Sequence, residues 1–224
     1  MNTRTIVITG ATGVLGNLVA KTFSEHGHSL ALLDSNGEKL DTLTRDLNLP
    51  NERLFAQTVD LLDAASVHAS AEAVTAHFGA VHALIHLVGG WTGGRTIQDS
   101  STDELTSMLN QHAWTTFNLL QAYVPHLIAA GWGRVITLSL PLTVKPMPKL
   151  GAYAAGKAAQ EALVMTLAEE TRATCVTANL IHVEAIDVKG DGKGTTPAEI
   201  VAAMLYLCSD EASKVTGARL PIYK

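Results

Sequence analysis

The chain opens with a short, largely β-branched run, Thr5–Thr9, that leads directly into a glycine-rich turn at residues 10–16 and a helical pattern over residues 14–26. A run of this length and composition predicts a strand that is buried on both faces. Glycines after such a strand permit a tight turn, and the start of the next helix offers unpaired N–H groups and a positive dipole end. In this context the sequence predicts a cradle for the pyrophosphate of a dinucleotide.

The rest of the chain repeats the alternation of short apolar runs with longer helical patterns. Further strands are expected near residues 29–33, 53–58, 82–87, 133–139, 175–181 and 218–222, and further helices near 38–47, 63–78, 102–130, 152–171 and 197–208. This alternation predicts βαβ units and a parallel sheet. We therefore expect an α/β fold of the Rossmann type, a doubly wound parallel sheet of about seven strands with helices on both faces, in a single domain of residues 1–224.

Two carboxylates follow the second and third predicted strands. Asp34 is placed to accept hydrogen bonds from the adenosine ribose of NAD and to repel the 2′-phosphate of NADP. Its neighbours Ser35 and Asn36 supply no basic group for that phosphate, so the sequence favours NAD over NADP. Asp34 also fits the cap of a turn or helix. Asp60 fits either a contact with the adenine edge or the cap of the helix expected from residue 63.

Tyr153 and Lys157 lie four residues apart in the alanine-rich run that begins the helix expected over residues 152–171. Residues with this spacing share one helix face. A nearby ammonium favours the phenolate, so the pair predicts a pKa for Tyr153 below the usual value of about 10. Such a tyrosine can act as the general acid or base for the proton of an alcohol or carbonyl. A plain surface pair has the same spacing, so this interpretation depends on the other motifs.

Taken together, these motifs resemble the short-chain dehydrogenase/reductase family over essentially the whole chain. The landmarks occur in the family's order: residues 10–16, Asp34, Asp60-Leu61, Gly89-Gly90, Asn110, Pro125, residues 133–136, Tyr153 with Lys157, and residues 209–218. The resemblance implies hydride transfer between a nicotinamide dinucleotide and a small carbonyl or alcohol substrate. It also implies that Tyr153 is the general acid/base, that Lys157 lowers its pKa and holds the nicotinamide ribose, and that Asn110 helps a proton relay.

The expected cofactor is NAD, with NADP less favoured. The residues that we expect to contact it are Gly10, Thr12, Gly13, Val14, Leu15, Gly16, Asp34, Asp60, Leu61, Val88, Gly89, Tyr153, Lys157 and Ile186. In the family, the apolar helix faces that correspond to residues 119–127 and 158–167 form an interface between subunits. The resemblance therefore implies a homodimer or homotetramer.

The substrate side departs from the family pattern. The family carries a serine thirteen residues before the tyrosine, and that position is Leu140 here. Ser139 is one residue earlier, and its side chain is expected on the opposite face of its strand. Thr143 is a second hydroxyl in the following loop. The segment 187–196, where the family has its substrate lid, is short and rich in glycine, which implies an open site or one closed by another subunit.

Three residues near the expected site each have two interpretations. His182 and Glu184 fit either a polar role that compensates for the missing serine or a solvated loop. Trp91 fits either a wall of the substrate pocket or a packing role beneath its loop.

Two alternatives to a carbonyl reductase remain open. The run at residues 88–94 is similar to the corresponding loop of dihydropteridine reductases, which are NADH-using members of the family that also lack the serine. The absence of a serine at position 140 also fits a dinucleotide-binding sensor or assembly subunit with little turnover. The pair Tyr153 and Lys157 favours the enzyme, because a binding protein has no need of the tyrosine.

Composition excludes several other classes of protein. The net charge is −5 and we find no cluster of Lys and Arg, so a nucleic-acid partner is not expected. Neither the two cysteines nor the nine histidines show metal-ligand spacing, so no metal site is expected. With no apolar stretch of about 18 residues and no signal peptide, we expect no membrane contact and a cytoplasmic location.

Overall fold

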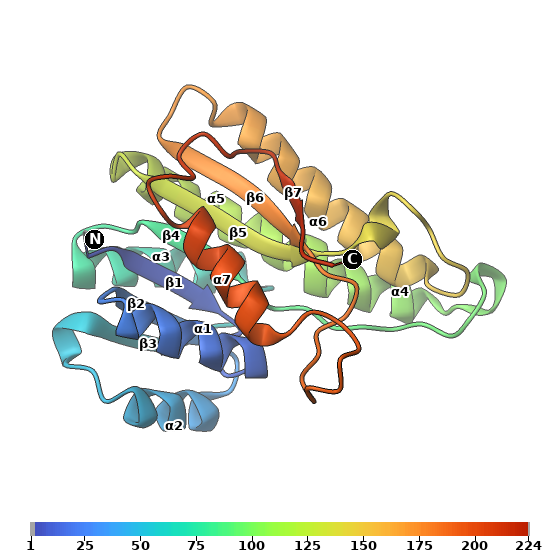
Figure 1. Cartoon of the computed structure of the whole chain (residues 1–224), viewed down its shortest axis with the longest axis horizontal. Helices are drawn as coiled ribbons and strands as arrows, with labels where there is room; N and C mark the ends of the chain where they lie inside the picture. The colour runs from blue at the N-terminus through green and yellow to red at the C-terminus, as the bar shows by residue number, and fades with distance from the viewer. Residues whose placement is uncertain (1–2, 224) are drawn as a thin grey trace.

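The computed structural model describes residues 3–223. At its centre is a parallel sheet of seven strands in the order β3-β2-β1-β4-β5-β6-β7 (Figure 1). The strands are β1 (Thr5–Thr9), β2 (Ser29–Asp34), β3 (Leu54–Thr58), β4 (Ala83–His86), β5 (Gly133–Ser139), β6 (Val176–His182) and β7 (Arg219–Pro221). The order reverses between β1 and β4, the type of position at which open α/β sheets bind ligands. The predicted fold class and strand number are confirmed.

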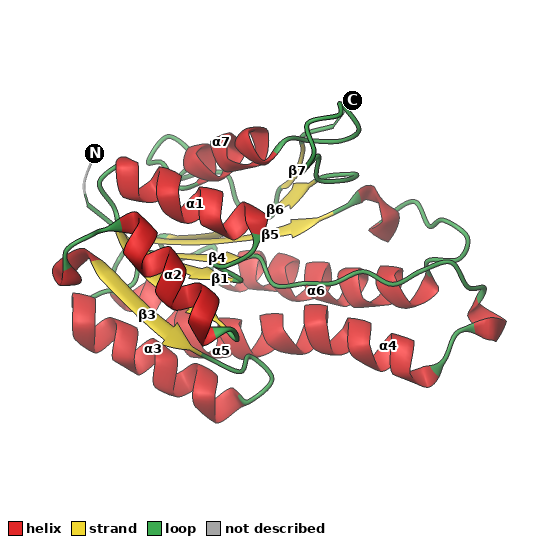
Figure 2. Ribbon diagram, turned by 90° about the horizontal axis from the view of Figure 1, so that it is seen from below, coloured by secondary structure: helices red, strands yellow, loops and turns green. Residues whose placement is uncertain are grey.

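Helices cover both faces of the sheet (Figure 2). One face carries α1 (Val14–Glu25), α2 (Gly37–Leu47) and α7 (Pro197–Leu207), and the other carries α3 (Ala64–Phe78), α5 (Thr115–Ala129) and α6 (Gly151–Glu170), with α4 (Thr102–Leu109) packed against α6. Because side chains alternate along a strand, Ile6 and Ile8 of β1 pack into the first layer and Val7 packs into the second. The strands are therefore buried on both sides.

Local signals in the sequence explain how the helices begin and end. Asp63 accepts the N–H of Ala65 at the start of α3, and Gly79, at φ 79°, ends this helix in the left-handed region. The cap that was one expected role of Asp60 is thus supplied by Asp63. At the start of α7, Thr196 and Glu199 form a capping box.

The helix predicted over residues 102–130 is interrupted. α4 ends at Leu109, a π-helical segment η3 (Asn110–Trp114) follows, and α5 begins after it. A π turn inserts an extra residue, so the side chains before and after η3 do not follow one continuous α-helical period. His112 of this segment contributes to the site described below. None of the helices in residues 3–223 has the length and apolar character needed to cross a bilayer.

Candidate active site

The glycine-rich turn lies at the carboxyl end of β1, where the order of the sheet reverses. Gly10 adopts φ 69°, and its N–H donates to the carbonyl of Leu33 in β2 at 3.0 Å. A Cβ on Gly16 would lie 2.2 Å from the carbonyl oxygen of Gly10, so only glycine allows α1 to approach the turn this closely. The N-cap of α1 is Gly13, and no side chain caps the helix there. The start of α1 therefore has the form of an anion site.

Asp34 joins the end of β2 to this turn. Its Oδ2 accepts both the N–H and the hydroxyl of Thr12, each at 2.9 Å, and its Oδ1 accepts the N–H of Asn36 at 3.1 Å. The bond to Asn36 is the turn cap that was one expected role of Asp34, whereas the N-cap of α2 is Asn36 itself. The carboxylate stays partly exposed at the end of the strand.

The other residues expected to contact the dinucleotide lie at neighbouring strand ends. Asp60 is exposed after β3 and accepts the N–H of Leu62 at 2.9 Å. Leu61 beside it is buried. Val88 follows β4 and touches the turn, because a Cβ on Gly10 would lie 3.2 Å from its Cγ2. The turn and the ends of β2, β3 and β4 thus form one continuous edge.

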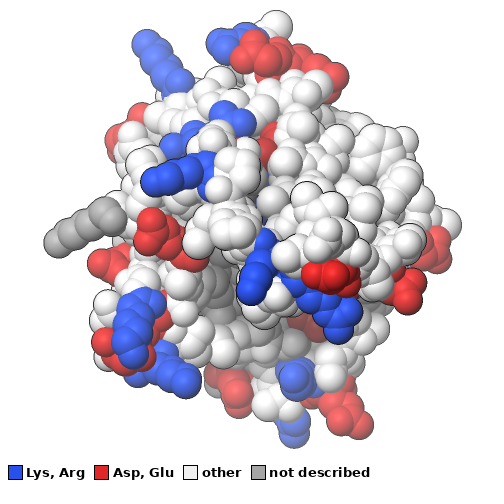
Figure 3. All heavy atoms as spheres, turned by 90° about the vertical axis from the view of Figure 1, so that its right-hand side faces the viewer, with Lys and Arg blue, Asp and Glu red and all other residues white. Residues whose placement is uncertain are grey.

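A cavity of about 900 Å³ opens beside this edge, at the carboxyl ends of β4 and β5. Tyr153, Lys157, His112 and Gly89 contribute to its wall. The apolar side chains around them are those of Leu87, Val88, Trp91, Leu138, Leu140, Pro141, Leu142, Met147, Leu150, Val183, Ala185 and Ile186. On the molecular face at the carboxyl ends of the strands, acidic and basic side chains are interspersed over a largely uncharged surface (Figure 3).

Trp91 lines this cavity while 66% of its surface remains exposed, so of its two expected roles the structure shows the wall. Within residues 3–223, no three His, Cys, Asp or Glu side chains are grouped to hold a metal.

Tyr153 and Lys157 stand one turn apart in α6, with Lys157 buried and both side chains at the cavity. Nζ of Lys157 donates to the carbonyl of Leu138 at 3.0 Å and to Oε1 of Gln160 at 2.9 Å. Burial lowers the pKa of Lys157 to about 8, although the charge of Glu161 acts in the opposite direction. The pKa of Tyr153 is raised, because burial of the phenol disfavours its charged form. The lowered pKa predicted for Tyr153 is therefore wrong for the protein without a bound dinucleotide.

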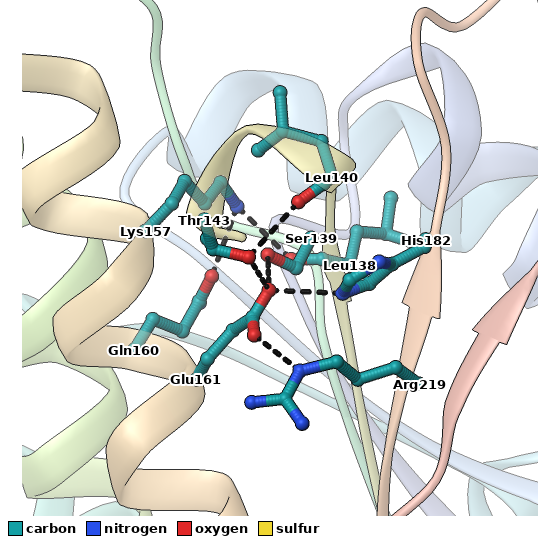
Figure 4. Close-up of polar contacts among 9 residues, drawn as sticks. All are labelled: Leu138, Ser139, Leu140, Thr143, Lys157, Gln160, Glu161, His182 and Arg219. Atoms are coloured by element: carbon teal, nitrogen blue, oxygen red, sulfur yellow. Dashed lines mark hydrogen bonds and ion pairs between the residues drawn. The ribbon is translucent and has the colours of Figure 1, made fainter. Parts of the chain in front are cut away.

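The side-chain hydroxyls of Ser139 and Thr143, which flank Leu140 in the sequence, are hydrogen-bonded to Glu161 (Figure 4). Oγ of Ser139 donates to Oε1 of Glu161 at 2.6 Å, as expected for a side chain on the opposite face of β5. Thr143, at the end of the short 3-10 turn η4 (Pro141–Thr143), donates to the same carboxylate oxygen at 2.8 Å. Position 140 itself presents only an apolar side chain to the cavity.

Glu161 is the centre of a buried network that joins α6 to the last two strands. Besides the hydrogen bonds from the two hydroxyls, its carboxylate accepts one from Nε2 of His182 in β6 at 2.9 Å and one from Nε of Arg219 in β7 at 2.6 Å. Burial raises the pKa of this carboxyl, but the hydrogen bonds from His182, Ser139, Arg219 and Thr143 outweigh burial and bring it to about 2. The solvated-loop interpretation of His182 is therefore wrong. Glu184, by contrast, is exposed at the cavity wall.

His112 was not expected from the sequence as a residue of the site. It lies within η3, and its ring meets the ring of Tyr153 edge to face with the centroids 5.6 Å apart. Its Nε2 lies 3.0 Å from the carbonyl oxygen of Gly90, and because a carbonyl only accepts, Nε2 carries the proton. A Cβ on Gly89 would lie 2.6 Å from Cε1 of this ring, so glycine at position 89 makes room for it.

Burial, the nearby charge of Lys157 and an opposing effect of the bond to Gly90 together lower the pKa of His112 to about 4, so the ring is neutral at pH 7. Asn110 begins η3 two residues earlier, and it is not among the described residues that line the cavity. No signal in the local sequence indicates that His112 faces the cavity.

Within the segment 187–196, where a short lid was expected, residues 187–195 fold back on themselves beside the cavity. The carboxylate of Asp187 accepts the N–H groups of Gly190, Asp191 and Gly192 at 2.7, 3.1 and 2.8 Å. A bridge between Ile186 and Thr195 closes the base of the loop. Ile186 reaches the cavity from the start of this loop.

A glycine-rich turn at the switch point of a parallel sheet, beside a cavity that contains a Tyr–Lys pair, is an arrangement with which α/β proteins bind a dinucleotide next to a second small molecule. Residues 4–196 match the sequence model of a protein family, the short chain dehydrogenases. The chain belongs to this family, whose members are oxidoreductases that use a nicotinamide cofactor.

Individual relatives agree with this assignment. An uncharacterised oxidoreductase of Staphylococcus epidermidis is 26% identical over 207 residues, which cover 89% of this chain and 88% of the relative. An NADPH-bound short chain oxidoreductase of Pseudomonas aeruginosa, described as containing an atypical catalytic center, is similar in fold with a TM-score of 0.90 at 22% identity, over 98% of this chain and 95% of that one. An NAD+-bound xylitol dehydrogenase gives a TM-score of 0.88 at 23% identity, over 98% and 97%.

Proposed function

We propose that this protein is an NAD(H)-dependent oxidoreductase that transfers a hydride between nicotinamide and a carbonyl or alcohol carbon. The observation that carries the proposal is the placement of Tyr153 and Lys157 in the wall of a cavity that adjoins the turn at residues 10–16. The bound dinucleotide supplies or accepts the hydride, while the chain's own side chains bind, orient and handle the proton.

The residues of the turn fit the pyrophosphate of such a cofactor. Space for it depends on glycines at positions 10 and 16, and the start of α1 carries no competing side-chain cap. We propose NAD rather than NADP because the carboxylate of Asp34 stands at the end of β2, with Ser35 and Asn36 beside it and no basic group among the three. Structures of similar fold contain either cofactor, so this preference rests on Asp34.

Tyr153 is the proposed general acid. Because its pKa is raised, the phenol carries its proton at neutral pH, the state needed to protonate a carbonyl oxygen as the hydride arrives. The reverse reaction needs the phenolate, so alcohol oxidation is expected to become faster as the pH rises. Lys157 is proposed to hold the nicotinamide ribose with its remaining N–H.

The cavity wall supports an apolar substrate. Leu140, Val183 and Trp91 line the same cavity as Tyr153, and the hydroxyls of Ser139 and Thr143 are bound to Glu161. Loss of one donor to a developing oxyanion costs about 10²–10³ in rate. We therefore propose a carbonyl substrate that is slow to react, or one that brings its own polar group, such as a quinonoid dihydropterin.

The same withdrawal of hydroxyls favours a second candidate function, a dinucleotide-binding sensor or assembly subunit with little turnover. The two functions differ in what they require of Tyr153. In an enzyme, Tyr153→Phe lowers turnover by about 10²–10⁴-fold and leaves NADH affinity nearly unchanged. In a sensor, no measured property changes.

The assembly and location of the protein are also part of the proposal. We propose a homodimer or homotetramer that forms through α5 and α6, because an apolar groove of about 860 Å³ runs between these helices with Trp114 and Phe117 partly exposed in it. Sedimentation of Phe117→Glu is expected to show monomers. Cys175 and Cys208 are free thiols, which fits the reducing cytoplasm.

The experiment that tests the function is a fluorescence titration with NADH and NADPH, followed by oxidation assays against ketones, quinones and quinonoid dihydropterin. Tight NADH binding with turnover supports the enzyme, and a dominant pterin rate identifies its substrate class. Binding without turnover on any compound favours the sensor. Failure to bind either nucleotide contradicts both functions.

A further inference from the structure

The side chain of Gln160 lies directly behind the ammonium of Lys157, outside the cavity wall (Figure 4). It is completely buried, with 0% of its surface exposed. Its Oε1 accepts one N–H of Lys157 at 2.9 Å, and the carbonyl of Leu138 accepts another at 3.0 Å. An ammonium has three N–H donors, so one remains for a ligand in the cavity.

The other end of the Gln160 amide is held by two threonines. Its Nε2 donates to Oγ1 of Thr116 in α5 at 3.1 Å and to Oγ1 of Thr137 in β5 at 3.2 Å. These hydroxyls donate in turn to the carbonyls of His112, at 2.6 Å, and His86, at 3.0 Å. Because carbonyls only accept, the direction of each bond is fixed. A flipped amide would point its NH₂ group at the ammonium and at no acceptor.

This arrangement presents a hydrogen-bond acceptor to the amino group of Lys157. A buried amide is costly unless all of its groups are bonded, and an apolar residue of similar size would fill the same space without that requirement. Every polar atom of Gln160 is used, and its only acceptor faces Lys157.

We infer that Gln160 is a positioning residue that holds the ammonium of Lys157 at the edge of the cavity, with the third N–H directed toward the nicotinamide ribose. The direction toward the ribose rests on the proposed function, whereas the hold on the ammonium does not. Gln160 contacts neither cofactor nor substrate and acts only through Lys157.

The charge of Lys157 depends on every titratable group that faces it. These groups are His86 from β4, His112 from η3, and Tyr153 and Glu161 from α6, with His182 and Arg219 beyond Glu161. Both imidazoles have lowered pKa values, about 3 and about 4, and are neutral at pH 7. Neither histidine therefore changes its charge near the pKa of Lys157, so a change at position 160 acts on the ammonium alone.

The first test measures the pKa of Lys157 by NMR of lysine-labelled protein without cofactor, with the signal assigned through Lys157→Arg. Gln160→Met keeps the length of the side chain and removes the acceptor, so it should lower the pKa of Lys157 by about 1. Gln160→Glu should raise it, because a carboxylate favours the ammonium. Thr177→Val, a buried polar-to-apolar change in β6, is the matched control and should leave it unchanged. An unchanged pKa in both Gln160 variants overturns the inference.

The second test is a double-mutant cycle on NADH affinity. Gln160→Met should weaken NADH binding about 5- to 10-fold in the wild-type background and have no further effect in Lys157→Met, since coupled residues are not additive. An equal loss in both backgrounds would mean a general effect on the fold and would overturn the inference. If the unmodified protein binds no NADH, the proposed function fails, while the NMR result still decides the role of Gln160.

Discussion

The two sides of the cavity are built in different ways. The side proposed to bind the dinucleotide is made mainly of backbone: one turn at residues 10–16 and the ends of adjacent strands, with glycines that clear the space. The side around α6 is made of buried side chains, in which Lys157, Gln160 and Glu161 bind groups from α5, β5, β6 and β7. The first side therefore depends on local geometry and the second on the completed fold.

The strongest test of this contrast is Gly16→Ala. Its Cβ would meet the carbonyl oxygen of Gly10 at 2.2 Å, so the turn must move or the helix must shift, at a cost of about 1–3 kcal/mol or more. We expect NADH binding to be lost in titrations. Gly13→Ala in the same turn is the control, because its Cβ would make ordinary contact at 3.4 Å and should preserve the fold. Equal affinity for NADH in Gly16→Ala and the wild type would contradict the close approach.

Glu161→Gln tests the side-chain half. With a pKa near 2, the carboxyl is more acidic in the folded protein than in the unfolded chain, where the ordinary value is 4.5. It therefore contributes stability above pH 4.5 that is lost as the pH falls toward 2, on the order of 3 kcal/mol in total. We expect the glutamine variant to unfold at lower urea concentration at pH 7 and to lose less stability between pH 5 and about pH 3. If the free energy of unfolding depends on pH in the same way in the variant and the wild type, the carboxylate does not make this contribution to stability.

A pair of variants in η3 separates the expected site residue from the observed one. His112→Ala removes the ring that touches Tyr153 and should lower turnover roughly 10- to 100-fold through misplacement of the phenol. Asn110→Ala should change turnover by less than about twofold, since that side chain does not line the cavity. The reverse order in steady-state kinetics would support the proton-relay role expected of Asn110.

The smallest effect is expected at Asp34. Asp34→Asn removes the charge that would repel a 2′-phosphate, so it should raise the ratio of NADPH affinity to NADH affinity about fivefold. This factor corresponds to about 1 kcal/mol, the repulsion energy of two like unit charges about 4 Å apart in water. Asp60→Asn, one strand further along, is the control and should leave the ratio unchanged. If the ratio of NADPH affinity to NADH affinity is the same in Asp34→Asn and the wild type, Asp34 does not determine the choice of cofactor.

The fold and the form of the glycine-rich turn were largely predictable from the sequence because their signals are local. Strand periodicity and the glycines of the first turn each depend on a few adjacent residues. The position of the Tyr–Lys pair on one helix face follows from helical periodicity in the same way.

The substrate side was predictable only in part. His112 rather than Asn110 lies against Tyr153, and nothing in the local composition signals the π turn that contains both residues. Burial outweighed the expected influence of Lys157 on the pKa of Tyr153. The role of His182 became visible only when β6 was placed beside α6. Each of these depends on contacts between segments that lie far apart in the chain.

The order of residues in the Glu161 network also sets when the network can form during synthesis of the chain. Its partners Ser139 and Thr143 precede it along the chain, His182 follows, and Arg219 lies 58 residues after it. During synthesis on the ribosome, the turn at residues 10–16 can form while α6 is still being made, whereas the carboxylate of Glu161 gains its last partner only after β7 has emerged. The nascent chain thus acquires the segment proposed to bind the nucleotide before it can complete the network around Glu161.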